Sequence, residues 1–465
     1  MDGNKDVTHQ RVSTTPLPER RTSATDRFFM GAFIVAVATL LFIGGSLATT
    51  VGVTPGPQIA RAYEGGKAFY AKLFHHDDVY MSDLWYPART DKRGVTINNA
   101  SRTNAGATLY TTGHEPAAYL ISMEGEVLHK WYRPFSSIWN DTAAVKDPQP
   151  DTHVYMRKAT LDSNGDLLAV YEGAGDTPYG YGLVKLDKDS NVIWSYLQSA
   201  HHDFDIAPDG RIFVLTQEIV DTPSPGLEHL KTPRLDDFLV ILSPDGEELE
   251  KIPLLAAVEQ SDYRQFLWEI SSFTLADALH TNSVHVITEE EAESFDYGEA
   301  GQVLVSFREP SAVGVIDLDE KKLVWAVKGY WTGQHDPHIL ANGNILLFDN
   351  RGNFRKPEGR SRVIEFDPAT MTLVWQYTGT AESPLQSDIR SYSQRLPNGN
   401  TLITESNGGR ILEVTPDQEI VWEYTNPVRG GPEKKKLPII CKAQRIDAGI
   451  ASAFLSKSLK SGGAV

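Results

Sequence analysis

From about residue 96 onward the chain alternates short apolar runs with tight polar turns, which is the pattern of β-strands joined by hairpins. One strand–turn–strand segment occurs twice with a His-Asp pair near its start, as HHDFDIAPDGRIFVL at 201–215 and QHDPHILANGNILLF at 334–348. The segment recurs without the histidine at 156–171 and 391–406. A unit repeated this often predicts a modular all-β fold, and a His-Asp pair in only some copies indicates a site carried by that scaffold.

A tryptophan near the end of an apolar strand marks the same repeat. Each tryptophan follows an apolar strand and an acidic turn, and the five are Trp131, Trp194, Trp325, Trp375 and Trp422. A sixth copy at 241–252 keeps the turn and lacks the tryptophan. Six units spaced by 47 to about 65 residues predict a six-bladed β-propeller over 96–445, with the tryptophans between blades. A strand at 442–446 is expected to close the ring, followed by a C-terminal tail over 446–465.

Residues 28–53 form an unbroken apolar run with no charge over 26 positions. A helix of about 20 apolar residues spans a bilayer, and this run is too long for the apolar region of a simple secretory signal. Three arginines, Arg20, Arg21 and Arg27, crowd its N-terminal side and favour a cytoplasmic N-terminus. We therefore expect a single-pass membrane protein with a cytoplasmic tail (1–27), a transmembrane anchor (28–53), a connector (54–95) and a propeller that faces the periplasm or cell exterior.

The composition limits the partners and the redox chemistry of the chain. It has 465 residues, of which 41% are hydrophobic and 23% charged, so a large core is expected and global disorder is excluded. The net charge of −17 argues against nucleic acid as the main partner. A single cysteine, Cys441, allows no intramolecular disulfide and is interpreted as a packed thiol. The sequence does not indicate an oligomeric state.

The candidate chemistry lies at the start of the repeated strands. His202 and His335 occupy the same position of the repeat and should enter one central channel from two blades. Between them, LHTNSVHVI (279–287) carries His280 and Asn282, two residues apart and so on one face of a strand. Arg308 interrupts the apolar strand that follows. Histidine and arginine suit the transfer of an anionic group, since both donate hydrogen bonds where negative charge develops and neutral imidazole is a nucleophile.

Two alternatives for the neighbouring residues remain open at this point. Asp203 and Asp336 either orient the imidazoles or only bond the turn backbone. His335 and His338, together with His202 and His280, are also candidate metal ligands, although no spacing typical of a metal site supports this strongly.

Several segments together resemble the bacterial arylsulfotransferases, six-bladed periplasmic propeller enzymes that do not use PAPS. The resemblance covers about 100–445 and rests on LHTNS, SFREPSAVGVID, GQHDPHILANGNILLFDN and YSQRLPNGNTLITES. It implies that a sulfuryl group moves from an aryl sulfate to a phenol by a ping-pong route through a sulfated histidine, without a metal or another cofactor. By position, it implies that His335 is the sulfated residue and that His202 is a further active-site histidine. It also implies that the sulfate oxygens are bound by His280, Asn282 and Arg308.

The chain departs from that family at its N-terminus, where members carry a β-sandwich and a cleaved signal, and in having no disulfide. We predict His335, His280, Arg308 and His202 as catalytic residues. The predicted substrate-binding residues are Asn282, His338 and Asp336, with no metal. The alternatives are a membrane-anchored scaffold propeller without catalysis and a sulfatase that uses water as acceptor. A quinone-dependent dehydrogenase is disfavoured, because it would need an eight-bladed tryptophan repeat and calcium-binding acidic residues.

Overall fold

The computed structural model describes residues 24–50, 78–162, 164–353, 359–451 and 454. The chain divides into two units, Met1–Asp77 and Asp78–Val465, which are described separately. Predicted parts at 1–23, 51–77, 452–453 and 455–465 lie outside the described residues.

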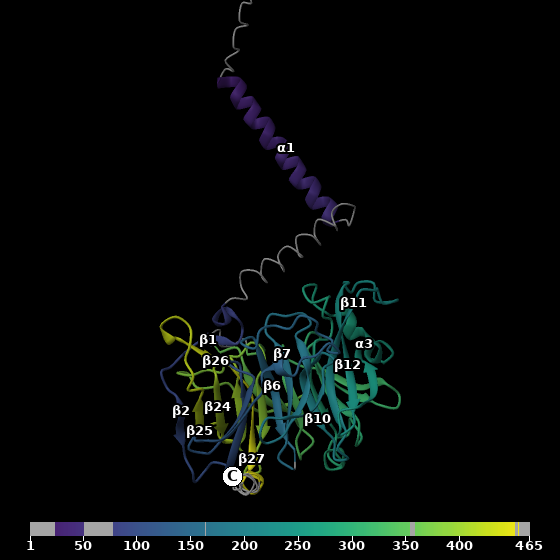
Figure 1. The fold of residues 1–465 in the computed structure, drawn as a ribbon. Coiled ribbons are helices and arrows are strands. Elements are labelled where there is room, and N and C mark those ends of the chain that lie inside the picture. The colour runs from purple at the N-terminus through teal and green to yellow at the C-terminus, as the bar shows by residue number, and fades with distance from the viewer. Residues whose placement is uncertain (1–23, 51–77, 163, 354–358, 452–453, 455–465) are drawn as a thin grey trace, which may run out of the picture. The chain divides into compact units, whose positions relative to one another are not determined.

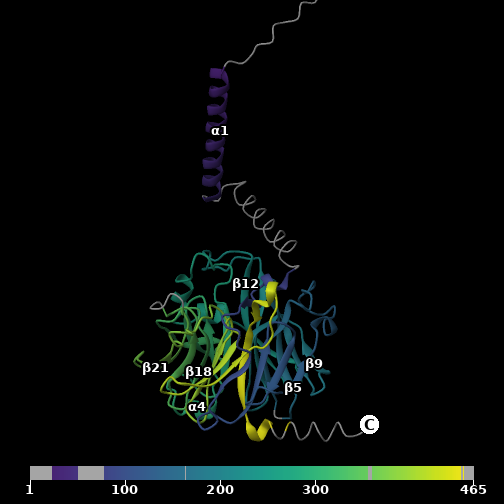
Figure 2. The ribbon, with the colours of Figure 1, turned by 90° about the vertical axis from the view of Figure 1, so that its left-hand side faces the viewer.

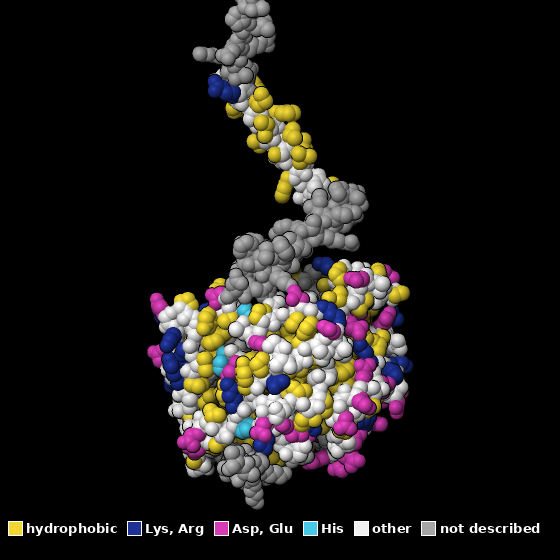
Figure 3. Space-filling model, viewed as in Figure 1, with side chains coloured by type: hydrophobic (Ala, Val, Ile, Leu, Met, Phe, Trp, Pro, Cys, Tyr) yellow, Lys and Arg dark blue, Asp and Glu magenta, His cyan; other side chains and the backbone are white. Residues whose placement is uncertain are grey.

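The first unit contains one long helix, α1 (Ala24–Thr50). Its segment Arg27–Leu47 has a mean hydropathy of 2.3, and none of it is buried. Large apolar side chains are exposed along the helix, as Figure 3 shows in yellow. Among the described residues this is the one helix long and apolar enough to cross a membrane. The helix begins four residues before the predicted start at 28, since Ala24–Arg27 continue the helical geometry outside the apolar run.

The second unit is a propeller of six antiparallel sheets, each named here by its innermost strand (Figures 1 and 2). The innermost strands of neighbouring blades contact one another around a ring. The first three blades run, from inside to outside, β27 (Ile440–Asp447), β3 (Gly106–Thr112), β4 (Ala117–Ile121), β5 (Val127–Tyr132); β6 (Val154–Leu161), β7 (Leu167–Gly173), β8 (Gly180–Leu186), β9 (Val192–Tyr196); and β10 (Ala200–Ile206), β11 (Ile212–Val220), β12 (Arg234–Leu242), β13 (Glu248–Pro253).

The other three blades complete the ring. They run β14 (Thr281–Val286), β15 (Val303–Phe307), β16 (Ala312–Asp317), β17 (Lys322–Lys328); β18 (His335–Ile339), β19 (Ile345–Asp349), β20 (Arg362–Phe366), β21 (Leu373–Tyr377); and β22 (Tyr392–Arg395), β23 (Thr401–Glu405), β24 (Arg410–Val414), β25 (Ile420–Thr425). A fifth strand, β2 (Gly94–Asn98), covers the outer edge of the β22 blade. Short elements between strands are β1 (Trp85–Pro87) paired with β26 (Lys436–Pro438), α3 (Leu254–Glu259), α4 (Glu289–Ala292) and the single turns η1 (Val79–Met81), η2 (Phe135–Ser137), η3 (Arg264–Trp268) and η4 (Pro432–Lys434).

The C-terminal strand closes the ring, as expected from the sequence. β27 pairs with β3, so that Ala443 lies opposite Tyr110. One blade therefore combines the end of the chain with its early strands, and β27 supplies the innermost strand of that blade. Cys441 lies buried in β27, and burial raises the pKa of its thiol to about 12, so it stays a packed thiol.

Three of the repeated tryptophans contact the next blade. Each one meets the turn that precedes the outermost strand of that next blade. The Trp375 indole donates to Pro416 O at 2.9 Å, and the Trp422 indole donates to Met123 O at 2.8 Å. The Trp194 ring lies against Gly246, where an added Cβ would meet it at 2.6 Å. The predicted position between blades therefore holds for these three.

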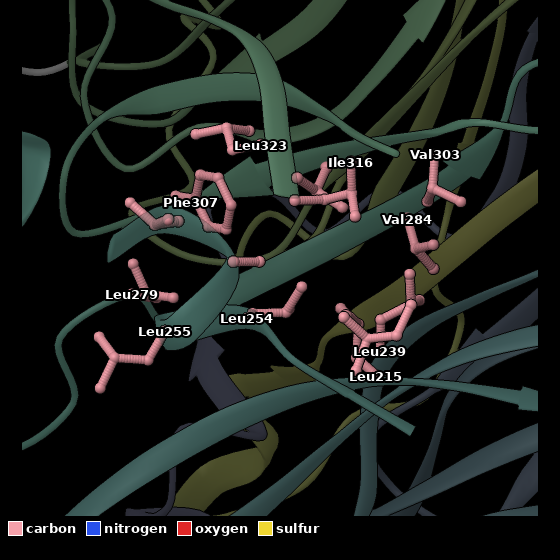
Figure 4. Close-up of a cluster of buried hydrophobic side chains, with 14 of the residues drawn as sticks. Leu215, Leu239, Leu254, Leu255, Leu279, Val284, Val303, Phe307, Ile316 and Leu323 are labelled. Atoms are coloured by element: carbon pink, nitrogen blue, oxygen red, sulfur yellow. The ribbon is translucent and has the colours of Figure 1, made fainter. Parts of the chain in front are cut away.

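Apolar side chains fill the space between adjacent blades. Figure 4 shows this for the β10 and β14 blades, where Leu215 and Leu239 face Val284 and Val303. α3 adds Leu254 to the same cluster. These contacts hold the innermost strands at fixed positions, so the residues at their starts form a rigid ring.

Candidate functional site

A cavity of about 210 Å³ opens at the end of the ring where the innermost strands begin. Four predicted catalytic residues line it, namely His202, His280, Arg308 and His335. Other residues that line it and were not predicted include Arg157, Glu172, Tyr179 and Arg390. His202, His280 and His335 come from three different blades, each at or near the start of an innermost strand.

The strands that carry these residues are bulged near their starts. The pairing of β10 with β11 shifts between His201 and Phe204, and that of β18 with β19 shifts between His335 and His338. His202 adopts a positive φ of 52°, in the left-handed region. A bulge reorients a side chain relative to the regular pleat and is common beside active sites, and here it accompanies the turn of these histidines toward the cavity.

His335 is held in one tautomer. Its Nδ1 lies 2.8 Å from Asn350 Oδ1 and 3.0 Å from Gly333 O, both hydrogen-bond acceptors. The Asn350 amide cannot be reversed, because its Nδ2 donates to Ser387 O and Arg390 O at 2.7 and 2.8 Å. Nδ1 of His335 therefore carries the proton, and Nε2 of the neutral ring keeps its lone pair.

The electrostatics of the cavity keep His335 and His202 uncharged. Burial lowers the pKa of His335 well below 6.5, and the Arg157 and Arg308 charges lower it further. Burial and the Arg157 charge likewise hold the pKa of His202 well below its usual value. Burial lowers the pKa of His201, whose Nδ1 lies 2.8 Å from Nδ1 of His202, to about 3. Neutral imidazole has the lone pair that a nucleophile needs.

The aromatic rings converge on a small volume. The His202 ring centre lies 5.0 Å from that of His280 and 6.3 Å from that of His335. Tyr179 packs edge-on against His202 at 5.3 Å. The buried Tyr179 hydroxyl has no hydrogen-bond partner among the described residues, and burial raises its pKa, so it remains a donor.

His280 and Arg308 reach the cavity from one blade and are tied to carboxylates. His280 Nδ1 lies 2.5 Å from Asp277 Oδ2, and Arg308 Nη1 donates to Glu309 Oε1 at 2.6 Å. Burial acts to raise the pKa of Asp277, but the charge of His280 and its hydrogen bond outweigh this and lower it. The backbone N–H of Arg308 donates to His280 O, so the two residues are held together.

Asn282, Asp336 and His338 do not line this cavity. The Asn282 amide is buried and donates to Gln334 O at 2.8 Å, directly before His335. Asp336 and His338 line a second cavity of about 300 Å³. His335 lies opposite Phe348 and His338 opposite Leu346, two residues farther along β19, so at about 3.3 Å per residue His338 lies roughly 7 Å farther along the blade than His335.

The repeated aspartates bond neighbouring strands. Asp203 Oδ2 accepts from Val284 N at 3.1 Å, and Asp336 Oδ2 accepts from Ser393 N at 2.8 Å. The sequence left open a role in orienting the imidazoles or a bond to the turn backbone, whereas these hydrogen bonds join the backbone of the innermost strand of an adjacent blade. Within the described part of the chain, no group of three or more His, Cys, Asp or Glu side chains is placed to hold a metal ion.

The sequence analysis missed Arg157 and Asn350. Arg157 stands in the 156–171 copy of the repeat at the position of His202 and His335, so repeat alignment was a usable signal. Asn350 directly follows β19 in the FDN segment and reaches His335 only through the pairing of β18 with β19. No local pattern indicates that contact.

Comparisons with solved structures find matches of low sequence identity. A protein of unknown function from Bacteroides caccae matches with a TM-score of 0.46 and 13% identity, over 73% of this chain and 98% of its own. A streptogramin B lyase matches with a TM-score of 0.39 and 12% identity, over 75% of this chain and 89% of its own. A virginiamycin B lyase from Staphylococcus aureus matches with a TM-score of 0.38 and 10% identity, over 78% of this chain and 98% of its own. No curated protein sequence matches the chain.

The family comparison is specific. The family model described as arylsulfotransferase (ASST) matches residues 158–427, more than half of the chain. The matched range contains His202, His280, Arg308 and His335, the four predicted residues that line the cavity. The chain therefore belongs to the arylsulfotransferase family.

Proposed function

We propose that the protein transfers a sulfuryl group from an aryl sulfate to a phenol through a covalent intermediate on His335. The observation that carries this is the fixed, neutral imidazole of His335, with its proton on Nδ1 and its lone pair on Nε2. In the first half-reaction, Nε2 forms a bond to sulfur while the sulfur–oxygen bond to the aryl group breaks. The donor leaves as a phenolate, and a sulfoimidazolium remains.

The surrounding residues have complementary roles in this proposal. Arg308 and His280 bind the sulfuryl oxygens, where negative charge builds in the transition state. His202 lies beside both other histidines and, being neutral, donates a hydrogen bond to the leaving phenolate oxygen. Asn282 holds Gln334 O and so positions the backbone that leads into His335.

The second half-reaction reverses the first with a different phenol. The acceptor loses its proton and its oxygen attacks sulfur, so that the nitrogen–sulfur bond breaks and His335 returns to the neutral state. The proton that the acceptor releases balances the proton that the donor phenolate takes up. No net proton and no cofactor are consumed. We place this activity on a single-pass membrane protein whose propeller faces the periplasm or cell exterior, a proposal supported by α1 and by the arginines before it.

The test uses the full-length chain in detergent, without PAPS or added metal. 4-Nitrophenyl sulfate is supplied with and without a phenol, and nitrophenolate release is followed together with the mass of the protein. Release that depends on the phenol, with a sulfuryl adduct mapped to His335, supports the proposal. Release without an acceptor indicates a sulfatase. A folded protein that is inactive toward a panel of aryl sulfates indicates a non-catalytic propeller.

The lowered pKa of His335 predicts an unusual pH profile. A histidine nucleophile is inactive once protonated, and the pKa of His335 lies well below 6.5. The acidic limb of kcat/KM for sulfuryl transfer should therefore lie well below pH 6.5, measured with an aryl sulfate whose own ionisation is constant in that range. A limb at or above pH 6.5 would contradict a neutral, buried His335.

Asn350 should control the tautomer of His335. We expect Asn350→Ala to lower kcat by about 100-fold, with Gly333 O remaining as a weaker acceptor for Nδ1–H. Asn400→Ala is the matched control, because its buried amide also donates to two acceptors, Arg102 O and Glu413 Oε1, away from the cavity. Equal kcat in the two variants, measured on protein of equal fold by circular dichroism, would rule out this role for Asn350.

A further inference from the structure

Arg157 occupies the histidine position of the repeat in the β6 blade. Aligned on the glycine of the hairpin turn, it corresponds to His202 in the β10 blade and His335 in the β18 blade. The pairing of β6 with β7 shifts between Met156 and Lys158, so the strand is bulged at Arg157 as well. Arg157 therefore lines the same cavity as the two histidines.

The guanidinium of Arg157 is buried without a complete set of partners. The residue is 1% exposed, and neither Nη1 nor Nη2 has a hydrogen-bond partner among the described residues. Its closest carboxylate is that of Glu172, whose Oε2 lies 3.7 Å from Nε. A buried charge with unsatisfied donors is costly unless an anion or another acceptor completes it.

The neighbouring groups do not supply the hydrogen-bond acceptors that the Arg157 guanidinium lacks. Glu172 already accepts from the Tyr155 hydroxyl at 2.6 Å and from His202 N at 2.7 Å. The other buried guanidinium in the cavity, Arg390, donates to Asp83 at 2.7 Å and to Tyr155 at 3.1 Å. The free donors of Arg157 are therefore available to a ligand in the cavity.

We propose that Arg157 is a further residue that binds the sulfate group of the aryl sulfate donor, on the β6 side of the cavity and in addition to Arg308 and His280. This rests on the proposed function, and it gives the site a second guanidinium besides Arg308. A planar guanidinium donates two parallel hydrogen bonds to the oxygens of a sulfate ester, which a neutral phenol cannot accept in the same way. Arg157 therefore discriminates the charged donor from the neutral acceptor.

Binding without turnover tests this proposal. In the full-length His335→Gln protein, calorimetry measures the Kd of 4-nitrophenyl sulfate and of 4-nitrophenol, with and without Arg157→Gln. We expect Arg157→Gln to weaken binding of the ester about 10- to 100-fold and to leave binding of 4-nitrophenol within about twofold. Arg157→Lys keeps the charge but loses the paired donors, so it should weaken ester binding by a smaller factor.

Arg211→Gln is the control, since this partly exposed arginine pairs with Asp209 at the turn of the β10 blade, and ester binding should be unchanged. Ester binding unaffected by Arg157→Gln, or an equal loss for both ligands, would overturn the proposal. If Arg157→Gln does not fold, the same comparison is made with Arg157→Lys: its loss of affinity for 4-nitrophenyl sulfate is set against its loss of affinity for 4-nitrophenol. A protein that binds the ester through Arg157 but never turns it over would refute the proposed function and leave this inference standing.

A second readout separates electrostatics from structure. The Arg157 charge contributes to the lowered pKa of His335, so Arg157→Gln should move the acidic limb of kcat/KM to higher pH, while Arg157→Lys should leave it close to that of the unmodified protein. A purely structural role would give no such difference between the two variants.

Discussion

Replacing His335 with alanine should abolish sulfuryl transfer, by about four orders of magnitude or more in kcat. The substitution removes the only atom that forms the covalent bond in the proposed reaction, Nε2, so no residual ping-pong route remains. It also leaves Asn350 Oδ1 without its imidazole donor, at a cost of about 1–3 kcal/mol in stability. The propeller should therefore stay folded, which circular dichroism and a thermal unfolding curve check. Nitrophenolate release and the sulfuryl adduct should be lost together.

His338→Ala is the matched control, because it removes the other histidine of the same strand, β18. His338 lines the second cavity and not the one that contains His335. We expect kcat/KM to stay within about threefold of the unmodified protein. Turnover retained by a folded His335→Ala protein would exclude His335 as the nucleophile, and a loss equal to that of His335→Ala in the His338→Ala protein would restore His338 to the substrate site.

The repeat explains why the fold was predictable from the sequence. The turn residues recur in every blade and the strand-end tryptophans in five of the six, so these local patterns mark the same supersecondary unit. The inner strands carry the histidines because they begin each unit. Convergence of His202 and His335 in one cavity follows from that equivalence, since a closed ring brings equivalent positions together.

The direction of individual side chains was not predictable in the same way. In a regular strand Asn282 would lie on the same face as His280. The register shift between Thr281 and Ser283 turns the Asn282 side chain away from that face, and its amide donates to Gln334 O. A bulge depends on contacts across the sheet, which local alternation does not encode. Arg157 differs in residue type from His202 and His335, so only its position in the repeat, and not a shared histidine, indicates that it belongs to the site.

Asp203→Ala should be among the most destabilising substitutions in the propeller. Asp203 is 1% exposed, and its Oδ1 lies 2.6 Å from the Lys158 ammonium of the β6 blade. Its Oδ2 accepts from Ser283 and Val284 of the β14 blade at 2.9 and 3.1 Å. One carboxylate therefore joins three blades. Its removal leaves the buried Lys158 ammonium without a carboxylate, with Phe204 O as its remaining acceptor. We therefore expect the free energy of unfolding to fall by about 3–5 kcal/mol, measured by urea unfolding followed through tryptophan fluorescence.

Asp336→Ala provides the comparison, since it removes the equivalent aspartate of the β18 blade. Asp336 accepts from Ser393 N, and the Lys442 ammonium lies 3.7 Å away, so we expect a loss of only about 1–2 kcal/mol. Equal losses in the free energy of unfolding for Asp203→Ala and Asp336→Ala would show that the ion pair between Asp203 and Lys158 adds no stability. The double variant Asp203→Ala, Lys158→Met should recover part of the loss, because no buried charge is then left unpaired.

The pH dependence of the free energy of unfolding shows whether the charge of Asp203 stabilises the fold. Burial acts to raise the pKa of Asp203, but the charges of Lys158 and Lys442, together with the hydrogen bonds to the carboxylate, outweigh it and lower the pKa. A lowered carboxylate pKa contributes stability above the unfolded-state value of about 3.9, and this stability is lost as pH falls through the folded-state pKa. The difference between Asp203→Ala and the unmodified protein should therefore be full at neutral pH and shrink in acid. A constant difference across that range would mean that packing, and not the charge of Asp203, joins the three blades.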